Sequence, residues 1–256
     1  MTRTRRACAV AAVSAVLAVV SGCGGGTKAG PATSPATTAA GAGAPATASA
    51  AAPAPPPVPV PTFTAAAAVT VRTLTSLTFK DGATPGTYDM PVTALTKEAA
   101  GTRTRPPLTP AACQDVWDIV YGKAAPAGVS QLINWKADIF PGAATLTAYP
   151  HGTAAGVFRV LTADLSLCRT VSGVDAGGSR YTDPIAREAA PKAGDQAVRF
   201  QEAATLPDGD VKYTDRVVVR VGDVIAAFDM VDVGRRTPFP AALLTREVQR
   251  LAAARR

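Results

Sequence analysis

Alternating apolar and polar positions dominate the last third of the chain. Residues 197–203 and 211–221 follow this two-residue period, residues 224–231 are the next candidate strand, and the turn at 207–210 and the pair Gly222-Asp223 separate the three segments. A period of two places successive side chains on opposite faces of a strand, and Gly-Asp pairs are typical of tight hairpin turns. The pattern therefore predicts two consecutive antiparallel hairpins.

Weaker strand patterns lie nearer the N-terminus. Residues 129–137 and 144–149 alternate on either side of a turn at Pro141-Gly142, and residues 180–188 form a further candidate strand. Residues 69–79 are also interpreted as a strand, whereas residues 101–107 read as a loop.

Three segments have helical spacing. The first covers 111–121, with Thr109 as N-cap, Pro110 as its first residue and Gly122 after its end. The second runs over 153–170 and the third over 239–254. The apolar stripe of the first helix is Ala112/Cys113, Val116/Trp117 and Val120/Tyr121. That of the second is Ala154, Val157, Phe158, Leu161, Leu165 and Cys168. That of the third is Ala241, Leu244, Val248 and Leu251. Trp117 and Phe158 are expected in the core. The predicted class is α+β, an antiparallel sheet flanked by about three helices.

The first 22 residues have a different character. A basic tip precedes the apolar run Ala7–Val20, and Val20-Ser21-Gly22-Cys23 follows. This arrangement resembles a bacterial lipoprotein signal peptide, which implies cleavage before Cys23 and acylation of its sulfur. An ordinary secretory signal is an alternative. A membrane-spanning anchor is less favoured, because a spanning helix needs about 20 apolar residues. Arg5-Arg6 leaves export by either the Sec or the twin-arginine route open.

Residues 23–68 are rich in Ala, Pro and Thr, and Lys28 is their one charged residue. Such a composition cannot bury a core and is typical of a disordered linker. We therefore predict a lipid-anchored linker over 23–68 and an extracytoplasmic domain over 69–256.

The net charge changes when these parts are set aside. The whole chain carries +7, and removing the four basic residues of the first 68 leaves about +3 for the domain. No basic stripe interleaved with aromatic residues is present, so a nucleic-acid partner is not expected.

Cysteine usage agrees with export. Cys8 would leave with the signal and Cys23 would be acylated, which leaves Cys113 and Cys168 in the domain. Two cysteines in an oxidising compartment predict one disulfide, here between two helices, and two buried free thiols are the alternative.

Candidate chemistry is sparse. His151 is the only histidine, so a multi-histidine metal site is impossible, and its place before a helix favours a turn role. No nucleotide-binding or hydrolase motif occurs, and no cofactor or metal is predicted.

The carboxylates have ordinary structural explanations. Asp208 and Asp210 are expected to serve their turn, and Asp223 its hairpin. Asp229 and Asp232 are as consistent with solvated positions as with a site. Three aromatic residues could line a groove, although packing is their usual role: Trp135, Tyr149 and Tyr181.

Several segments together resemble the PknH-like extracellular sensor domain of actinobacterial receptor kinases and lipoproteins. They are Thr109–Cys113, Leu165–Cys168, Gly194–Val198 and Val218–Ile225, and the resemblance covers residues 109–256. It implies an antiparallel sheet flanked by helices, with a cleft proposed to bind an unknown ligand. The kinase domain has two disulfides, whereas this domain can form one, so no binding residue is transferred.

The sequence thus favours a non-enzymatic sensor or binding module, lipid-anchored on the extracytoplasmic face of the cell membrane. Its expected partners are the bilayer, through acylated Cys23, and a small molecule, a cell-wall fragment or an envelope protein. The alternative is an envelope hydrolase that cleaves cell-wall glycans through carboxylates. A lipid carrier would require a large apolar cavity.

Overall fold

The computed structural model describes residues 69–81, 84–95, 107–175 and 177–255. The predicted signal peptide, Cys23 and the linker to residue 68 lie outside these ranges, as does most of the loop expected at 101–107. Within them, no helix combines the length and the apolar character needed to cross a bilayer.

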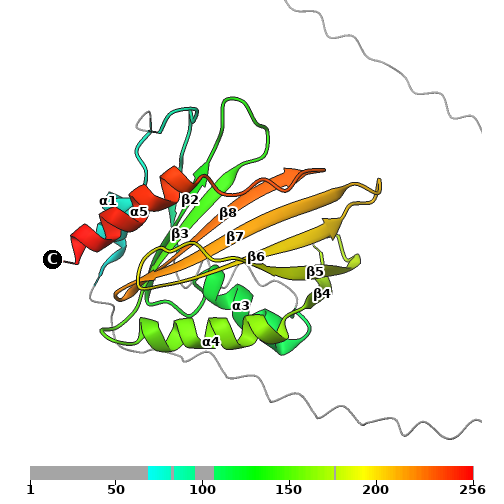
Figure 1. Ribbon diagram of the computed structural model, residues 1–256, viewed down its shortest axis with the longest axis horizontal. Coiled ribbons are helices and arrows are strands. Elements are labelled where there is room, and N and C mark those ends of the chain that lie inside the picture. Colours follow the sequence, from blue (N-terminus) through cyan, green and yellow to red (C-terminus); the bar gives the residue numbers. More distant parts are fainter. Residues whose placement is uncertain (1–68, 82–83, 96–106, 176, 256) are drawn as a thin grey trace, which may run out of the picture. The chain divides into compact units, whose positions relative to one another are not determined.

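Eight strands form one antiparallel sheet in the order β1-β2-β3-β8-β7-β6-β5-β4 (Figure 1). The strands are β1 (Val92–Ala94), β2 (Ala127–Ile133), β3 (Gly142–Ala148), β4 (Thr170–Val174), β5 (Arg180–Glu188), β6 (Gln196–Thr205), β7 (Val211–Val221) and β8 (Val224–Val233). The helices in the described ranges are α1 (Val71–Leu77), α3 (Ala111–Val120), α4 (Ala154–Leu167) and α5 (Ala241–Ala254). The α+β class is confirmed, but these ranges hold four helices rather than three.

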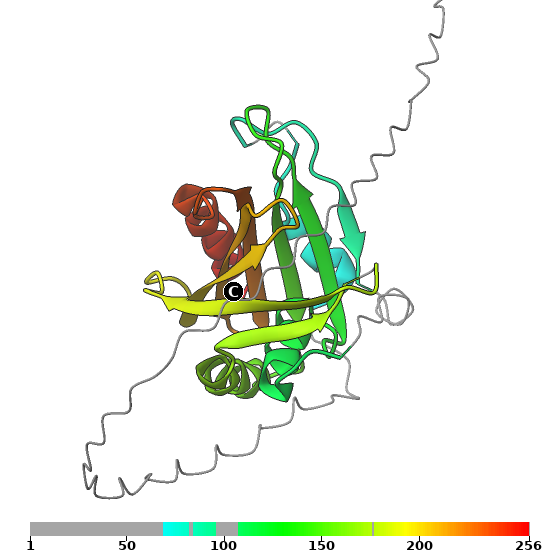
Figure 2. The same cartoon turned by 90° about the vertical axis from the view of Figure 1, so that its right-hand side faces the viewer.

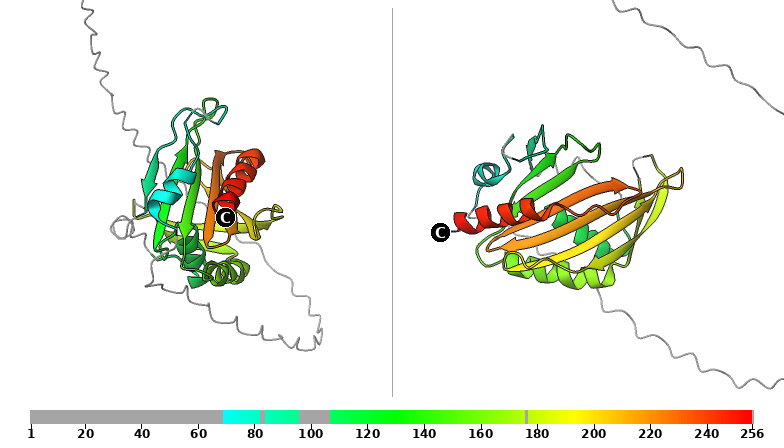
Figure 3. Two further views of the ribbon diagram at one scale, coloured as in Figure 1. Left: turned by 90° about the vertical axis from the view of Figure 1, so that its left-hand side faces the viewer. Right: turned by 45° about the horizontal axis from the view of Figure 1, so that its top comes forward.

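The two predicted hairpins are present and run side by side as β6, β7 and β8 (Figure 3). Only Gly222 and Asp223 connect β7 to β8, and Gly222 has a φ of 61°. Glycine suits this position because a side chain is strained in the left-handed region. In the preceding turn, Asp208 accepts a hydrogen bond from the backbone N–H of Asp210 at 3.1 Å. This confirms the structural role expected of Asp208.

One face of the sheet is covered by α3 and α4, which Figure 2 shows next to each other. Their apolar stripes meet inward-facing residues of β6, β7 and β8 in a continuous core. Trp117 and Phe158 are both almost fully buried there, as predicted, and the ring of Trp117 lies 5.9 Å from that of Phe200. Each such large side chain contributes roughly 2–3 kcal/mol by leaving water.

The opposite face carries α1 and α5, with α1 against β2 and β3 and α5 against β7. Leu74 of α1 and Leu251 of α5 are buried in this second core. Phe239, just before α5, packs its ring 5.1 Å from that of Phe228 on β8. The sheet is therefore buried on both faces where these helices lie.

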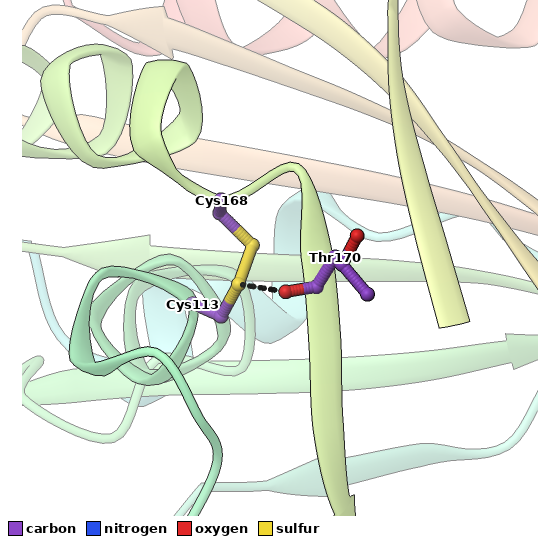
Figure 4. Close-up of a disulfide and its surroundings, with 3 residues drawn as sticks. All are labelled: Cys113, Cys168 and Thr170. Carbon is purple, nitrogen blue, oxygen red and sulfur yellow. Dashed lines mark hydrogen bonds between the residues drawn. A yellow bond between two sulfur atoms is a disulfide. The ribbon is translucent and has the colours of Figure 1, made fainter. Parts of the chain in front are cut away.

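A disulfide joins the two helices of the first face, as predicted (Figure 4). Cys113 lies in α3 and Cys168 directly follows α4, with their Cα atoms 4.9 Å apart. Both cysteines are fully buried. The carbonyl oxygen of Thr170 lies 3.4 Å from Sγ of Cys113. This is a close contact rather than a hydrogen bond, because a bridged sulfur carries no proton.

The strand predicted over residues 69–79 is wrong, since this segment forms α1. Its Val and Thr residues favour a strand by propensity, but Oγ1 of Thr70 accepts a hydrogen bond from the N–H of Thr73 and caps a helix. Burial of Leu74 against the sheet adds tertiary stabilisation, which overrides propensity in so short a segment.

Three predicted helix ends also differ. Pro110, not Thr109, is the N-cap of α3, because the backbone of Thr109 pairs with Ser172 beside β4. The second helix ends at Leu167 rather than residue 170, where β4 already begins. The last helix starts at Ala241, since the N–H of Phe239 donates to Oδ2 of Asp215 in an extended segment.

Candidate functional site

A pocket of about 460 Å³ opens at one end of the sheet, and we refer to it as the end pocket. The β7–β8 turn, the beginning of α4, the C-terminal end of α5 and one side of α1 surround it, at the left of Figure 1. Its apolar lining comprises Val69, Leu77, Val221, Val224 and Leu251. Its polar lining includes His151, Arg220, Asp223 and Arg255.

Asp223 connects two of these elements. Its Oδ2 lies 2.9 Å from Nδ1 of His151, and its Oδ1 accepts a hydrogen bond from the N–H of Gly152 at 2.8 Å. The β7–β8 turn is thereby tied to the turn before α4. Asp223 lies in the hairpin turn expected for it, and its carboxylate has an additional role that the sequence did not indicate, because it reaches a different turn.

His151 occupies the turn position expected for it, and its side chain is 95% exposed. In a Ser-His-Asp or Cys-His arrangement, the histidine activates a serine hydroxyl or a cysteine thiol that lies within reach of the imidazole. The residues lining the end pocket include no serine or cysteine, and their one hydroxyl side chain, that of Thr73, is hydrogen-bonded to Thr70 at 3.1 Å. The observed role of the pair is to hold two turns together.

A second carboxylate organises the other side of the pocket. Asp195 accepts hydrogen bonds from Nη1 of Arg220 at 2.9 Å and from Nη1 of Arg255 at 3.1 Å. The N–H of Gly222 adds a third donor at 2.7 Å. Burial opposes ionisation, but the Gly222 N–H and the two guanidinium groups hold the pKa of Asp195 below its ordinary value.

Gly222 also allows Arg255 to lie directly on the turn. A Cβ atom at residue 222 would be 2.7 Å from Nε of Arg255, closer than such atoms can approach. The guanidinium of Arg255 is therefore positioned by both Asp195 and the turn backbone. Its side chain is 50% exposed, so part of the group faces solvent at the pocket rim.

A separate charged cluster lies under α3, on the face that α3 and α4 cover. Arg216 of β7 donates from Nη1 to Oδ2 of Asp229 at 2.8 Å and from Nη2 to Oε2 of Glu202 at 2.9 Å. Its guanidinium carbon lies 5.3 Å from the ring centre of Trp117 and 5.6 Å from that of Tyr121. Burial alone disfavours the charged guanidinium, but its partners reverse this and hold the pKa of Arg216 above its ordinary value.

The sequence left open whether Asp229 and Asp232 are exposed to solvent. In the structure both carboxylates are largely shielded from solvent and form ion pairs. Burial raises the pKa of Asp229, although Arg216 opposes the shift. Asp232 is almost fully buried, accepts a hydrogen bond from Thr237 and pairs with Arg235 at 3.0 Å. The two residues are on opposite faces of β8, so they do not form one carboxylate pair.

Asp183 of β5 was not singled out from the sequence. It is 6% exposed, and burial together with the nearby negative charge of Glu202 raises its pKa to about 6. Its signal in the sequence is weak, because β5 is mostly exposed and one aspartate among its polar residues looks solvated. Arg216 had a clearer signal, since it adjoins the apolar run 217–219 of a central strand.

The three aromatic candidates do not form one groove. Tyr149 is fully buried, and burial raises its pKa to about 12. Tyr149 and Tyr181 pack with the core under α3 and α4, whereas Trp135 packs with the core of the opposite face. Their ordinary packing role is thus observed. In the described ranges, no cluster of His, Cys, Asp or Glu has the composition of a metal site.

No family model and no curated protein matches this chain. Among solved structures, the extracellular domain of PknH from Mycobacterium tuberculosis has a TM-score of 0.50 and 14% sequence identity, over 73% of this chain and 96% of that domain. An uncharacterized protein from Mycobacterium smegmatis, an Rv0999 ortholog, has a TM-score of 0.33 and 13% identity, over 73% of this chain and 95% of its own.

The similarity to the PknH extracellular domain identifies the fold. The PknH-like architecture implied by the sequence resemblance is therefore confirmed. At 14% identity the similarity extends to the fold alone.

Proposed function

We propose that this protein is a lipid-anchored, extracytoplasmic and non-enzymatic module that binds a small ligand in its end pocket. The observation that carries the proposal is the pocket itself, whose volume of about 460 Å³ lies within the usual range of ligand sites. Its apolar wall and few oriented polar groups are also typical of such sites.

Three further observations support the location. The sequence before Cys23 has the form of a lipoprotein signal. The Cys113–Cys168 disulfide suits an oxidising compartment. The fold occurs in the extracellular domain of a mycobacterial kinase, PknH, which makes an extracytoplasmic sensor role a reasonable proposal for this chain.

Native mass spectrometry of the full-length protein, purified from its own cell envelope, tests ligand binding. We expect a co-purified small molecule that is absent from the Ala155→Trp variant, because the indole would fill the pocket from α4. Ala163→Trp, exposed on the same helix and outside the pocket, is the matched control and should retain the ligand. Equal retention in both variants would place the ligand elsewhere and contradict the proposal.

One observation favours the hydrolase alternative. The pKa of about 6 at Asp183, next to Glu202, would suit a general acid paired with a second carboxylate. Glu202, however, is already ion-paired with the buried Arg216. Turnover of peptidoglycan fragments by the wild type, lost in Asp183→Asn, would establish the hydrolase and overturn the non-enzymatic proposal.

A further inference from the structure

We infer that the end pocket selects an amphipathic anion: a molecule with an apolar body and a carboxylate or phosphate head. This inference rests on the proposed function, since it specifies the ligand of the same pocket. It depends on two properties of the pocket, the apolar character of its wall and the balance of hydrogen-bond donors and acceptors on its rim.

The wall explains the apolar body. Val69 and Leu77 contribute from the α1 side, and Leu251 contributes from α5. Val221 and Val224 complete the wall from the two strands on either side of the turn. Val221, Val224 and Leu251 are already buried, whereas Val69 and Leu77 are partly exposed. A ligand that places hydrocarbon against this wall therefore removes mainly its own apolar surface from water, so affinity should increase with the length of its chain.

The rim explains the negative head. Both carboxylates near the pocket have their oxygens engaged by protein donors: Asp223 by His151 and Gly152, and Asp195 by Gly222, Arg220 and Arg255. Arg255 uses only Nη1 for Asp195, and no described residue accepts from its Nε or Nη2. Thr73 also lines the pocket, but its hydroxyl is hydrogen-bonded to that of Thr70, and His151 bonds Asp223 through Nδ1 alone. Apart from Nε2 of this exposed imidazole, the open hydrogen-bonding groups among these charged side chains are donors.

The position of Arg255 makes this donor suitable for binding. Asp195 and the backbone at Gly222 fix one side of the guanidinium, while the half-exposed side chain leaves its other edge open to solvent. A planar guanidinium presents parallel N–H groups that match the two oxygens of a carboxylate or phosphate. The head group would bind there, with its apolar body directed along the wall.

Titration calorimetry with a matched series of probes tests the inference on the full-length chain. The probes are hexanoate, octanoate, octyl phosphate, octyltrimethylammonium and inorganic phosphate, each below its micelle concentration. We expect octanoate and octyl phosphate to bind, with octanoate about tenfold tighter than hexanoate. Arg255→Gln should weaken octanoate binding roughly tenfold, since one charge-assisted contact is lost.

Arg187→Gln is the matched control, because Arg187 is exposed on β5 and outside the pocket. It should bind octanoate as the wild type does, and any partitioning of probes into the anchor region is common to all variants. Equal affinity for octyltrimethylammonium would overturn the anionic head, and equal affinity for inorganic phosphate would overturn the apolar body. Each of these results leaves a ligand-binding pocket in place.

Absence of binding by all probes would overturn the ligand class. The proposed function would then depend on the separate comparison of Ala155→Trp with Ala163→Trp, which requires no knowledge of the ligand. The two experiments therefore fail independently.

Discussion

Glu247 of α5 is a buried acid that lacks full compensation. It is 1% exposed, and its Oε2 lies 3.2 Å from Nη1 of Arg250, while its Oε1 has no hydrogen-bond partner in the described ranges. Burial raises the pKa of Glu247 from 4.5 to about 7, although Arg250 and Lys80 oppose the shift. Arg250 also donates to the carbonyl oxygens of Leu77 and Thr78, so this group of charges joins α5 to the end of α1.

The raised pKa predicts a pH dependence of stability. Between about pH 4.5 and 7 the folded state keeps a proton on Glu247 that the unfolded chain has released. The free energy of unfolding therefore decreases as pH rises through this window. Above about pH 7 the stabilisation that the proton on Glu247 provides is fully lost. Glu247→Gln removes the titration. It should unfold like the wild type near pH 4 and be more stable by about 2–3 kcal/mol at pH 8.

Denaturant unfolding at a series of pH values measures this difference. Glu188→Gln, exposed at the end of β5, is the control and should follow the wild-type curve at each pH. A constant difference between Glu247→Gln and the wild type across the whole range would show that ionisation of Glu247 is not the cause.

Arg216 differs from Glu247, because two carboxylates, those of Glu202 and Asp229, depend on its positive charge. Arg216→Met would leave the partly buried Asp229 and Glu202 without their cation, which predicts a loss of about 3 kcal/mol in the free energy of unfolding. Arg187→Met, a change at an exposed residue of β5, should cost less than about 0.5 kcal/mol. Adding Glu202→Gln and Asp229→Asn to Arg216→Met should recover most of the loss, and failure to recover it would point to packing against Trp117 instead.

At the scale of elements, the disulfide is a covalent constraint on the α3–α4 pair. It closes a sequence separation of 55 residues, for which the chain-entropy model gives a stabilisation of about 4 kcal/mol. We expect the double variant Cys113→Ala/Cys168→Ala to fold with a free energy of unfolding lower by about 2–4 kcal/mol. Denaturant unfolding with and without reductant checks this, since reductant should lower the stability of the wild type and leave the double variant unchanged.

The predictability of each element depended on how local its determinants are. The β6–β7–β8 hairpins follow from a two-residue period and two short turns, all readable within a few residues. The segment 69–79 was misread because its Val and Thr residues suggest a strand, whereas a cap at Thr70 and burial of Leu74 against distant strands produce α1. The boundary errors at Thr109 and Phe239 have the same origin, since a partner far along the chain fixes each backbone.

The end pocket was less accessible to sequence reasoning than the fold. His151 and Asp223 were each noticed in the sequence. They are 72 residues apart, however, and no local pattern indicates that their side chains bond to each other. Arg220, Asp195 and Arg255 look like ordinary surface charges in their local sequence. Their meeting requires the β7–β8 turn, the segment before β6 and the end of α5 to converge, and this is a property of the tertiary structure alone.

At the scale of the whole molecule, the lipid anchor proposed at Cys23 would determine where the pocket operates. Val69 contributes to the pocket lining, and the linker of residues 23–68 joins the chain directly before it. Under the proposed function, a ligand-binding domain tethered in this way would meet envelope molecules at a high effective concentration near the membrane. The proposal for the whole molecule thus depends on a covalent event at one residue, Cys23.

Cys23→Ala tests that event. Without the sulfur no diacylglycerol can be attached, so we expect the variant to incorporate no labelled palmitate and to leave the membrane fraction. Each buried acyl methylene contributes roughly 0.8 kcal/mol, so two chains hold a protein where one is marginal. The apolar run Ala7–Val20 is too short to replace them by spanning the bilayer, which needs about 20 residues.

Cys8→Ala, in the same predicted signal, is the control and should remain labelled and membrane-bound. Continued labelling of Cys23→Ala would place the lipid elsewhere, whereas an unlabelled protein that stays in the membrane fraction would require an attachment other than the lipid.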